Sequence, residues 1–275
     1  MRPPGVPDAV TASLTVVMPH YRCEAYLAEA VRSVLEQSYR DLELFVVDDS
    51  SASEAWLEAL RPFRADARLR AYRTGRNVGP YRIINRILAE TDSAFVAFQD
   101  ADDVSSVTRL EVQVLALGRR RLDIVGTGFL TIDESGKVLE RQPMRRWPLF
   151  WGVLGTDFVV HPVTVLSRRT VFDVLGGFDG TARFEADTDF LIRAQFAFRI
   201  GNVRRCLYSY RARTDSLSRA PDTGIGSPLR EAYRRKMFDR RAALRAISDP
   251  AALRSALRAP PNDVAFTLEE IRSWP

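Results

Sequence analysis

The sequence predicts an α/β fold in which a mostly parallel sheet is flanked by helices and followed by a helical C-terminal extension. Short apolar runs alternate with stretches of helical periodicity through the first half of the chain, which is typical of right-handed βαβ units. The 275 residues are 46% hydrophobic and include 15 Phe and 4 Trp, enough apolar surface for a sizeable core. Basic residues are concentrated near the C-terminus, on a helical pattern.

The first half is predicted to contain five strands, at 14–18, 42–47, 69–72, 94–98 and 123–131. Between them, apolar residues recur with the period of one helix face, which predicts helices around 27–35, 56–60, 83–88 and 110–117. Pro19 is expected to end the first strand, and Gly118 is expected to stop the fourth helix.

The second half is predicted to be less regular. From about Arg141, prolines, tryptophans and glycines interrupt the pattern, and only strands at 163–166 and 206–210 and a helix at 187–196 are expected before Ser227. After Ser227 the chain is predicted to be helical and amphipathic. Its packing stripe is expected to comprise Leu229, Tyr233, Met237, Leu244 and Ile247, with solvated arginines on the other face.

The segment after Ser227 is strongly basic, with nine lysines and arginines up to Arg258 against three acids. Such a face suits nucleic acid, anionic lipid or a phosphorylated substrate. No aromatic–basic interleaving or known module accompanies it, so nucleic acid is not expected as a partner. The basic helix is expected to pack on the domain or, alternatively, to make peripheral contact with an anionic membrane.

Two cysteines, Cys23 and Cys206, give neither a disulfide framework nor a metal-binding spacing. The N-terminus, MRPPGVPDAVTAS, has neither a signal-peptide nor an anchor pattern. No apolar run reaches the length of about 18 residues that would indicate a membrane span. A cytoplasmic location is therefore expected, with the inner face of the membrane as the place of any peripheral contact.

Polar side chains follow three of the predicted strands. His20 and Tyr21 follow the first strand, Asp48 and Asp49 the second, and the run Asp100-Ala101-Asp102-Asp103 the fourth. Ligands of open parallel sheets bind beyond the carboxyl ends of the strands, so five carboxylates are expected at one edge. Their mutual repulsion requires a cation or hydrogen-bond donors.

Carboxylate oxygens without sulfur ligands favour a hard ion such as Mg²⁺ or Mn²⁺. Such an ion would bridge two phosphates and stabilise a departing diphosphate. Each acid also has a structural interpretation, because pairs such as Asp48-Asp49 are common in turns and Asp103 is expected to cap the following helix. One cap does not need three acids, so Asp100 and Asp102 carry the functional hypothesis.

The order and spacing of seven segments resemble family 2 of the inverting glycosyltransferases, whose nucleotide-sugar-binding GT-A fold is a Rossmann-like α/β architecture. The resemblance covers roughly 14–218. The segments are VVMPHY (16–21), VVDDSS (46–51), RNVG (76–79), QDADD (99–103), LGGFD (175–179), ADTDFLIR (186–193) and YRARTDSLS (210–218).

The resemblance implies which residues bind the nucleotide of a nucleotide-diphosphate sugar. Pro19 and Tyr21 match residues that line the base pocket. Asp49 matches the acid that reads the base, with Asp48 beside it. A UDP-sugar is the favoured donor.

Further residues match the sugar-diphosphate part of the family's site. Asp100 matches the first acid of the DxD motif, near the donor ribose, and Asp102 matches the metal ligand, with Asp100 beside it. Arg213 stands where many members carry a histidine near the diphosphate; an arginine grips phosphate with a fixed fork and is not expected to bind the metal. Arg76 and Arg82 are candidates for a phosphate grip near the RNVG segment.

Asp187 matches the general base of the family. An acceptor hydroxyl is a poor nucleophile and needs a base as it attacks the anomeric carbon. Glu185 and Asp189 compete for this role, and Asp187 could instead cap the predicted helix.

The predicted function is metal-dependent inverting transfer of a sugar to a hydroxyl acceptor, which could be lipid-linked, in cell-surface polysaccharide or glycoconjugate biosynthesis. The expected organisation is a disordered tail (1–12), a nucleotide-sugar-binding half (13–135), an acceptor-binding half (136–220) and a basic helical extension (221–275). One alternative is a sugar nucleotidyltransferase, although the sequence has no glycine-rich loop after the first strand to hold a triphosphate. The other is a non-catalytic sugar-nucleotide binder.

Overall fold

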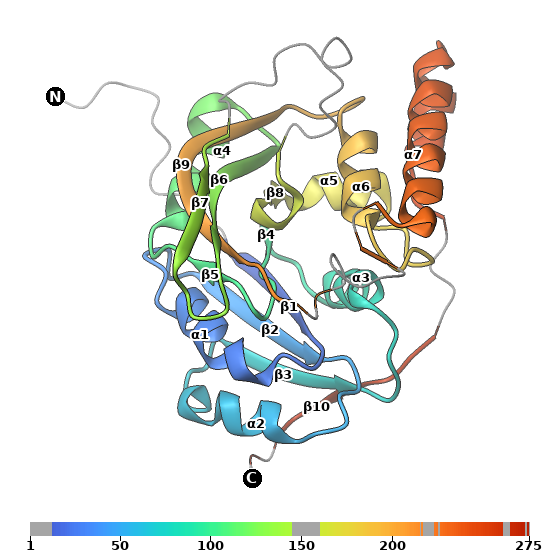
Figure 1. Ribbon diagram of the computed structural model, residues 1–275. Helices are drawn as coiled ribbons and strands as arrows, with labels where there is room; N and C mark the ends of the chain where they lie inside the picture. The colour runs from blue at the N-terminus through green and yellow to red at the C-terminus, as the bar shows by residue number, and fades with distance from the viewer. Residues whose placement is uncertain are drawn as a thin grey trace, which may run out of the picture.

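A mixed ten-stranded sheet lies at the centre of the computed structural model, with helices on both sides of it (Figure 1). The structure describes residues 13–144, 160–214, 216, 223–224, 226–260, 265–272 and 274. The tail predicted at 1–12 lies outside these residues, as do parts of the predicted acceptor-binding half and of the C-terminal extension.

The strands are β1 (Leu14–His20), β2 (Leu42–Asp48), β3 (Leu69–Thr74), β4 (Phe95–Phe98), β5 (Val104–Ser105), β6 (Ile124–Ile132), β7 (Val138–Gln142), β8 (Leu166–Arg168), β9 (Ile200–Arg211) and β10 (Leu268–Glu270). They are arranged in the order β10-β3-β2-β1-β4-β8-β6-β9-β5, and β7 pairs with β6.

The helices are α1 (Glu24–Leu35), α2 (Ala55–Leu60), α3 (Pro80–Glu90), α4 (Arg109–Arg120), α5 (Arg169–Leu175), α6 (Ala186–Ala194), α7 (Pro228–Ala246) and α8 (Pro250–Ala256). Two short 3₁₀ helices lie at Arg61–Phe63 and Pro162–Thr164.

The first four strands of the chain form the parallel part of the sheet. β1 pairs in parallel with β2 on one side and with β4 on the other, and β2 pairs in parallel with β3. The connections through α1, α2 and α3 are the crossovers that parallel strands require. The α/β fold class is confirmed, and the register places His20 opposite Asp48 at the carboxyl ends of β1 and β2.

Beyond β4 the sheet is mixed. β8 runs antiparallel to both β4 and β6, whereas β6 and β9 are parallel. β9 is long enough to reach back to β5, with which it pairs antiparallel just after the acidic run. This strand therefore carries residues 208–213 to the same edge of the sheet as the ends of β1, β2 and β4.

Two hydrophobic cores lie on the two faces of the sheet, because successive side chains of a strand point to opposite faces. Val16 and Met18 of β1 pack with α1, α2 and α4. Val17, between them, packs with α3, α5 and α6 on the other face. Both faces of the central strands are therefore buried, as in parallel sheets generally.

Several predicted boundaries are wrong. β1 continues through Pro19, which is tolerated because β4 pairs with β1 only as far as Val17. Helix α4 continues through Gly118 and ends where Arg121 adopts a left-handed conformation. The strand predicted at 163–166 is a 3₁₀ helix followed by β8. The predicted strand 206–210 is only the end of β9.

The C-terminal extension is not entirely helical. β10 follows α8 and pairs antiparallel with the outer strand β3 (Figure 1). The predicted packing stripe of α7 also needs correction: Met237 and Leu244 are buried, but Leu229 is 52% exposed. Among the described residues, we find no helix long and apolar enough to cross a membrane.

Candidate active site

The turn after β4 gathers acidic side chains from separate parts of the chain. Burial, together with the nearby negative charges of Asp102 and Asp187, raises the pKa of Asp100 to about 7. The buried guanidinium of Arg109 acts in the opposite direction. The DxD turn (Asp100–Asp102) and the predicted base are thus close enough to interact electrostatically.

Asp103 does not cap a helix, although the sequence predicts that it does. Helix α4 begins later, and its N-cap residue is Thr108. The Asp103 side chain is buried, and its Oδ1 accepts a hydrogen bond of 2.7 Å from the backbone N–H of Arg211. This carboxylate ties the DxD turn to the end of β9 and is not open to a ligand.

Asp102 and Arg213 form an ion pair. The Nη1 atom of Arg213 lies 2.9 Å from Oδ2 of Asp102. The guanidinium also lies over the ring of Tyr26, 5.4 Å from its centroid. The backbone carbonyl of Asp102 accepts a 2.8 Å hydrogen bond from Arg211 Nε. The predicted metal ligand and the predicted phosphate-binding arginine therefore touch each other.

His20 and Asp48 form a buried pair at the ends of β1 and β2. His20 Nδ1 lies 3.0 Å from Asp48 Oδ1, and both side chains are fully buried. Asp48 Oδ2 accepts a hydrogen bond from the backbone N–H of Ser51 at 3.1 Å. Burial alone would raise the pKa of Asp48, but the hydrogen bonds from His20 and Ser51 lower it overall. This geometry favours a structural role for Asp48 over the predicted contact with the nucleotide.

Asp49 organises the RNVG turn. Its Oδ1 accepts a hydrogen bond from the backbone N–H of Val78, and its Oδ2 accepts one from Gly79, each at 2.8 Å. Gly79 has a φ of +89°, which favours glycine. The Thr74 hydroxyl adds a third contact at 3.2 Å. Because a carboxylate has about four acceptor positions, Asp49 retains the capacity to accept from a ligand.

The other predicted donor-binding residues surround the same edge. Tyr21 directly follows β1 and is 42% exposed, and Pro19 is half-buried within that strand. Arg82 donates from Nη1 to the carbonyl of Val78 at 3.0 Å, which supports the RNVG turn from α3. Arg76 is exposed on that turn.

Asp187 lies in the first turn of α6, and the N-cap position belongs to Glu185. The carboxylate accepts a hydrogen bond of 2.7 Å from the backbone N–H of Thr188 and another from Tyr81. Burial raises its pKa, and these hydrogen bonds only partly offset the increase. A carboxylate with a raised pKa is suited to accept a proton.

The two competing acids are engaged elsewhere. Asp189 lies 2.7 Å from Arg193 Nε and 2.9 Å from Arg240 Nη1. Glu185 lies 3.4 Å from Arg230 Nη1 and 3.8 Å from Arg234 Nε. The geometry thus favours Asp187 over both as the base.

A family model for glycosyl transferase family 2 matches residues 15–171, which run from β1 into the start of α5 and include the DxD turn. The chain belongs to glycosyl transferase family 2. Membership of this family makes the protein a glycosyltransferase and decides against a sugar nucleotidyltransferase.

Curated relatives of this glycosyltransferase include EpsE of Bacillus subtilis (strain 168), which is 29% identical over 216 residues. These residues are 75% of this chain and 75% of EpsE. A second relative is the O-antigen biosynthesis glycosyltransferase WbnJ of Escherichia coli. It is 25% identical over 213 residues, which are 75% of this chain and 82% of WbnJ.

Solved structures share the fold of the glycosyltransferase. S. aureus TarS 1–349 in complex with UDP-GlcNAc superimposes with a TM-score of 0.68 at 20% identity, over 89% of this chain and 70% of TarS. The mannosyltransferase PcManGT from Pyrobaculum calidifontis, in complex with GDP-Man and Mn²⁺, has a TM-score of 0.59 at 16% identity, over 90% of this chain and 68% of PcManGT.

Sequence reasoning missed two buried residues beneath the DxD turn of this glycosyltransferase. Arg109 donates hydrogen bonds to Ser105 Oγ and to the carbonyl of Phe98, and burial lowers its pKa to about 10. Tyr208 lies under its guanidinium, and the Tyr208 hydroxyl oxygen accepts a hydrogen bond from the backbone N–H of Asp100. The sequence signal for Arg109 is its position on the apolar face of α4, where a buried arginine is unusual.

The DxD turn provides only part of a metal site. Within the described ranges, no three His, Cys, Asp or Glu side chains converge as a complete set of ligands. Asp100 and Asp102 nevertheless offer hard oxygen atoms where carboxylates crowd each other, and the ion pair with Arg213 uses Oδ2 of Asp102. These two acids fit Mg²⁺ or Mn²⁺ when a diphosphate and water complete the coordination.

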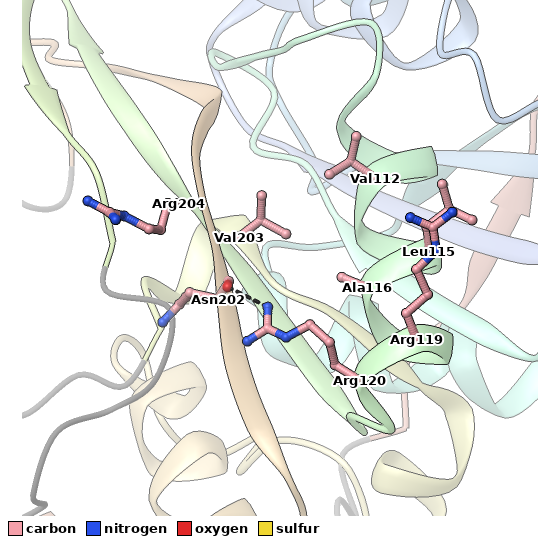
Figure 2. Close-up of a pocket in the computed structure, with 8 residues that line it drawn as sticks. All are labelled: Val112, Leu115, Ala116, Arg119, Arg120, Asn202, Val203 and Arg204. Carbon is pink, nitrogen blue, oxygen red and sulfur yellow. Dashed lines mark hydrogen bonds between the residues drawn. The ribbon is translucent and has the colours of Figure 1, made fainter.

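A separate groove of about 530 Å³ lies between α4 and β9 (Figure 2). It is lined by Val112, Leu115, Ala116, Arg119, Arg120, Asn202, Val203 and Arg204. Arg120 donates to the carbonyl of Asn202 at 2.7 Å across it. None of the candidate catalytic or donor-binding residues lines this groove, so it is not part of the candidate active site.

Proposed function

We propose that this glycosyltransferase moves a sugar from a nucleotide-diphosphate donor to a hydroxyl group, with inversion and with the help of a divalent ion. The observation that carries the proposal is the convergence of Asp100 and Asp102, from the DxD turn, with Asp187, from α6. A single displacement requires a group that stabilises the leaving diphosphate and a base for the acceptor hydroxyl, and these acids are candidates for the two roles.

A UDP-sugar is the proposed donor. The fold neighbour TarS binds UDP-GlcNAc, whereas PcManGT binds GDP-Man, so a nucleotide sugar suits this architecture. In this proposal, Asp49, Pro19 and Tyr21 surround the base at the ends of β1 and β2. Asp49 would accept from the base while its bonds to Val78 and Gly79 hold the edge of the pocket.

Asp102, assisted by Asp100, would hold the Mg²⁺ or Mn²⁺ ion, which when bound neutralises charge on the diphosphate. Arg213 lies beside Asp102 and adds a fixed positive charge at the same place. Arg82 would contact the diphosphate from α3, next to the RNVG turn. An arginine fork binds phosphate oxygens in a defined orientation.

In the proposed reaction, Asp187 accepts the proton of the acceptor hydroxyl while that oxygen forms a bond to the anomeric carbon. The bond from the anomeric carbon to the diphosphate oxygen breaks, and the nucleoside diphosphate leaves with the bonding electrons. The raised pKa of Asp187 increases its basicity when it is ionised. One displacement on the side opposite the leaving group inverts the configuration.

The proposed role is the biosynthesis of a cell-surface polysaccharide or glycoconjugate in the cytoplasm, on an acceptor that could be lipid-linked. The name of the relative WbnJ, an O-antigen biosynthesis enzyme, supports this role. Leu229 and Phe238 are exposed on α7, as is the basic residue Arg235, and exposed apolar and basic side chains on a helix suit anionic lipid.

Thermal shift with a panel of nucleoside-diphosphate sugars, with and without Mn²⁺, tests donor and metal together. A ligand that binds the folded state raises the Tm. We expect the largest shift with a UDP-sugar plus Mn²⁺ and its loss in Asp102→Ala or with EDTA. An Asp102→Ala variant that keeps the Mn²⁺-dependent shift would show that the metal assignment is wrong.

Flotation with vesicles tests the membrane contact separately. The protein is expected to float with anionic vesicles and not with neutral ones, because the proposed contact depends on basic side chains of α7. Equal recovery in the unbound fraction with both kinds of vesicle would contradict this contact and leave the proposed chemistry untouched.

A further inference from the structure

Helix α7 lies alongside α6 (Figure 1). Its arginines form ion pairs with Glu185 and Asp189, the acids two residues before and two residues after Asp187. The sequence pattern predicts that these arginines are solvated. Three of them instead face the catalytic domain: Arg230 is buried, and Arg234 and Arg240 are partly buried. The helix is therefore packed through charged as well as apolar side chains.

The first acid, Glu185, starts α6 in a conformation that is unfavourable for it. Its φ is +59°, in the left-handed region where a residue with a Cβ is strained. Arg230 and Arg234 approach Oε1 of Glu185 at 3.4 Å and 3.8 Å. Arg230 is itself fixed by a 2.8 Å hydrogen bond to the carbonyl of Thr223 and by the ring of Phe184. The surrounding α7 contacts thus hold the backbone at the start of α6.

The second acid, Asp189, is held from both sides. Arg193 of the same helix contacts Oδ2 at 2.7 Å, and Arg240 of α7 contacts Oδ1 at 2.9 Å. Arg193 also donates to the carbonyls of Leu175 and Gly177. A further hydrogen bond of 3.0 Å joins Arg240 to the carbonyl of Arg258. Asp189 thereby connects α6 to α5, to α7 and to the segment after α8.

Asp187 lies between these two acids in the sequence and differs from them in its contacts. Across the described residues, no lysine, arginine or histidine forms an ion pair with it, and its hydrogen bonds come from Thr188 and Tyr81. Glu185 and Asp187 repel each other electrostatically. Neutralising Glu185 and Asp189 therefore allows a third carboxylate to remain ionised within a short helical turn.

We propose that Arg230, Arg234 and Arg240 are positioning residues for Asp187, acting by neutralising its two acidic neighbours and by fixing the first turn of α6. The proposal rests on the base role proposed for Asp187. It gives α7 a part in transfer beyond covering the domain, and it concerns the geometry of the base rather than the binding of the nucleotide. Loss of these arginines should therefore lower kcat without weakening donor affinity.

The test compares inward and outward basic residues of α7. Arg234→Gln and Arg240→Gln remove contacts to Glu185 and Asp189, and Lys236→Gln and Arg245→Gln are matched controls at exposed positions. The measurements are the kcat of UDP-GlcNAc hydrolysis with Mn²⁺, the Kd of UDP, and amide hydrogen exchange at 186–190. A displacement of a catalytic group by about 1 Å can reduce the rate by about 100-fold.

We expect a fall in kcat of about 10- to 100-fold in the inward variants, an unchanged Kd for UDP, and faster exchange at 186–190. Arg240→Lys, which keeps the charge, should recover most of the loss. Effects no larger than those of the outward controls would overturn the proposal. So would an equal loss in Arg240→Gln and Arg240→Lys, since that pattern would mean general destabilisation.

Two further outcomes separate this inference from the proposed function. If the Asp187→Asn variant retained full turnover, both the assignment of Asp187 as the base and the positioning role of the arginines would be wrong. If UDP-GlcNAc is not turned over by the natural protein, exchange at 186–190 still decides, because unchanged exchange in both inward variants overturns the proposal. Should Arg240→Gln fail to fold, Arg234→Gln decides, since its side chain is 30% exposed.

Discussion

The donor side and the base side of the candidate active site are built in different ways. On the donor side, neighbouring parallel strands present His20, Asp48 and Asp49 in register, and a turn just before α3 closes around Asp49. On the base side, Asp187 depends on a helix from the C-terminal extension and on pairs such as Arg240–Asp189. The donor side is a property of the sheet, whereas the base side is assembled from distant segments.

This difference predicts how substitutions will behave. Changes on the donor side should act through nucleotide affinity or through the stability of the sheet edge. Changes on the base side should act on kcat at constant affinity, because the proposed nucleotide-binding residues lie on the donor side.

Asp187→Asn should reduce transfer about 100- to 10,000-fold, the usual contribution of a general base. The amide cannot accept the acceptor proton but has nearly the same shape, so the Kd of UDP should not change. Initial rates and calorimetry measure the two quantities. Asp173→Asn, on the exposed surface of α5, is the control and should retain activity; comparable losses in both variants would refute the assignment.

Arg213→Ala should weaken binding of UDP about tenfold, equivalent to about 1.4 kcal/mol, because a fixed cation beside Asp102 is lost. The affinity of Arg213→Lys for UDP should lie between those of the natural protein and Arg213→Ala, since lysine keeps the charge and loses the planar fork of donors. Titration calorimetry with Mn²⁺ present measures the change. Unchanged affinity together with a reduced kcat would place Arg213 on the base side of the comparison.

Asp48→Asn should lower the free energy of unfolding by about 1–3 kcal/mol, the cost of weakening a buried hydrogen-bonded carboxylate. Urea denaturation measures it. The pKa of Asp48 lies below its usual value in the folded protein, so its stabilising contribution is present above about pH 4 and is lost as the pH falls through the folded pKa. A difference between variant and natural protein that grows below pH 4 would contradict the pairing with His20.

The sequence was sufficient to predict the parallel part of the sheet and its acidic edge. Hydrophobic periodicity is local, so β1 to β4 and α1 to α4 could be recognised, and the carboxyl ends of parallel strands must share an edge. Asp49 and the DxD turn follow from that rule. The bonds of Asp49 to Val78 and Gly79 do not, because they depend on the shape of the RNVG turn.

The rest depends on long-range contacts that one sequence does not encode locally. Asp103 is a residue type that often caps helices, but here its carboxylate accepts a hydrogen bond from the backbone N–H of Arg211 in β9. Arg230 and Arg240 lie on a pattern that indicates a solvated face, and only the position of α6 shows that they have acidic partners. β10 is too short for periodicity to distinguish it from a loop.

The most direct test of the central claim is the configuration of the sugar first released from an α-linked UDP-sugar that the protein turns over, followed by proton NMR in the presence of Mn²⁺. A single displacement assisted by Asp187 predicts that the β anomer appears first and that Asp187→Asn abolishes its formation. Initial release of the α anomer would contradict the account, because it requires two displacements and a covalent intermediate.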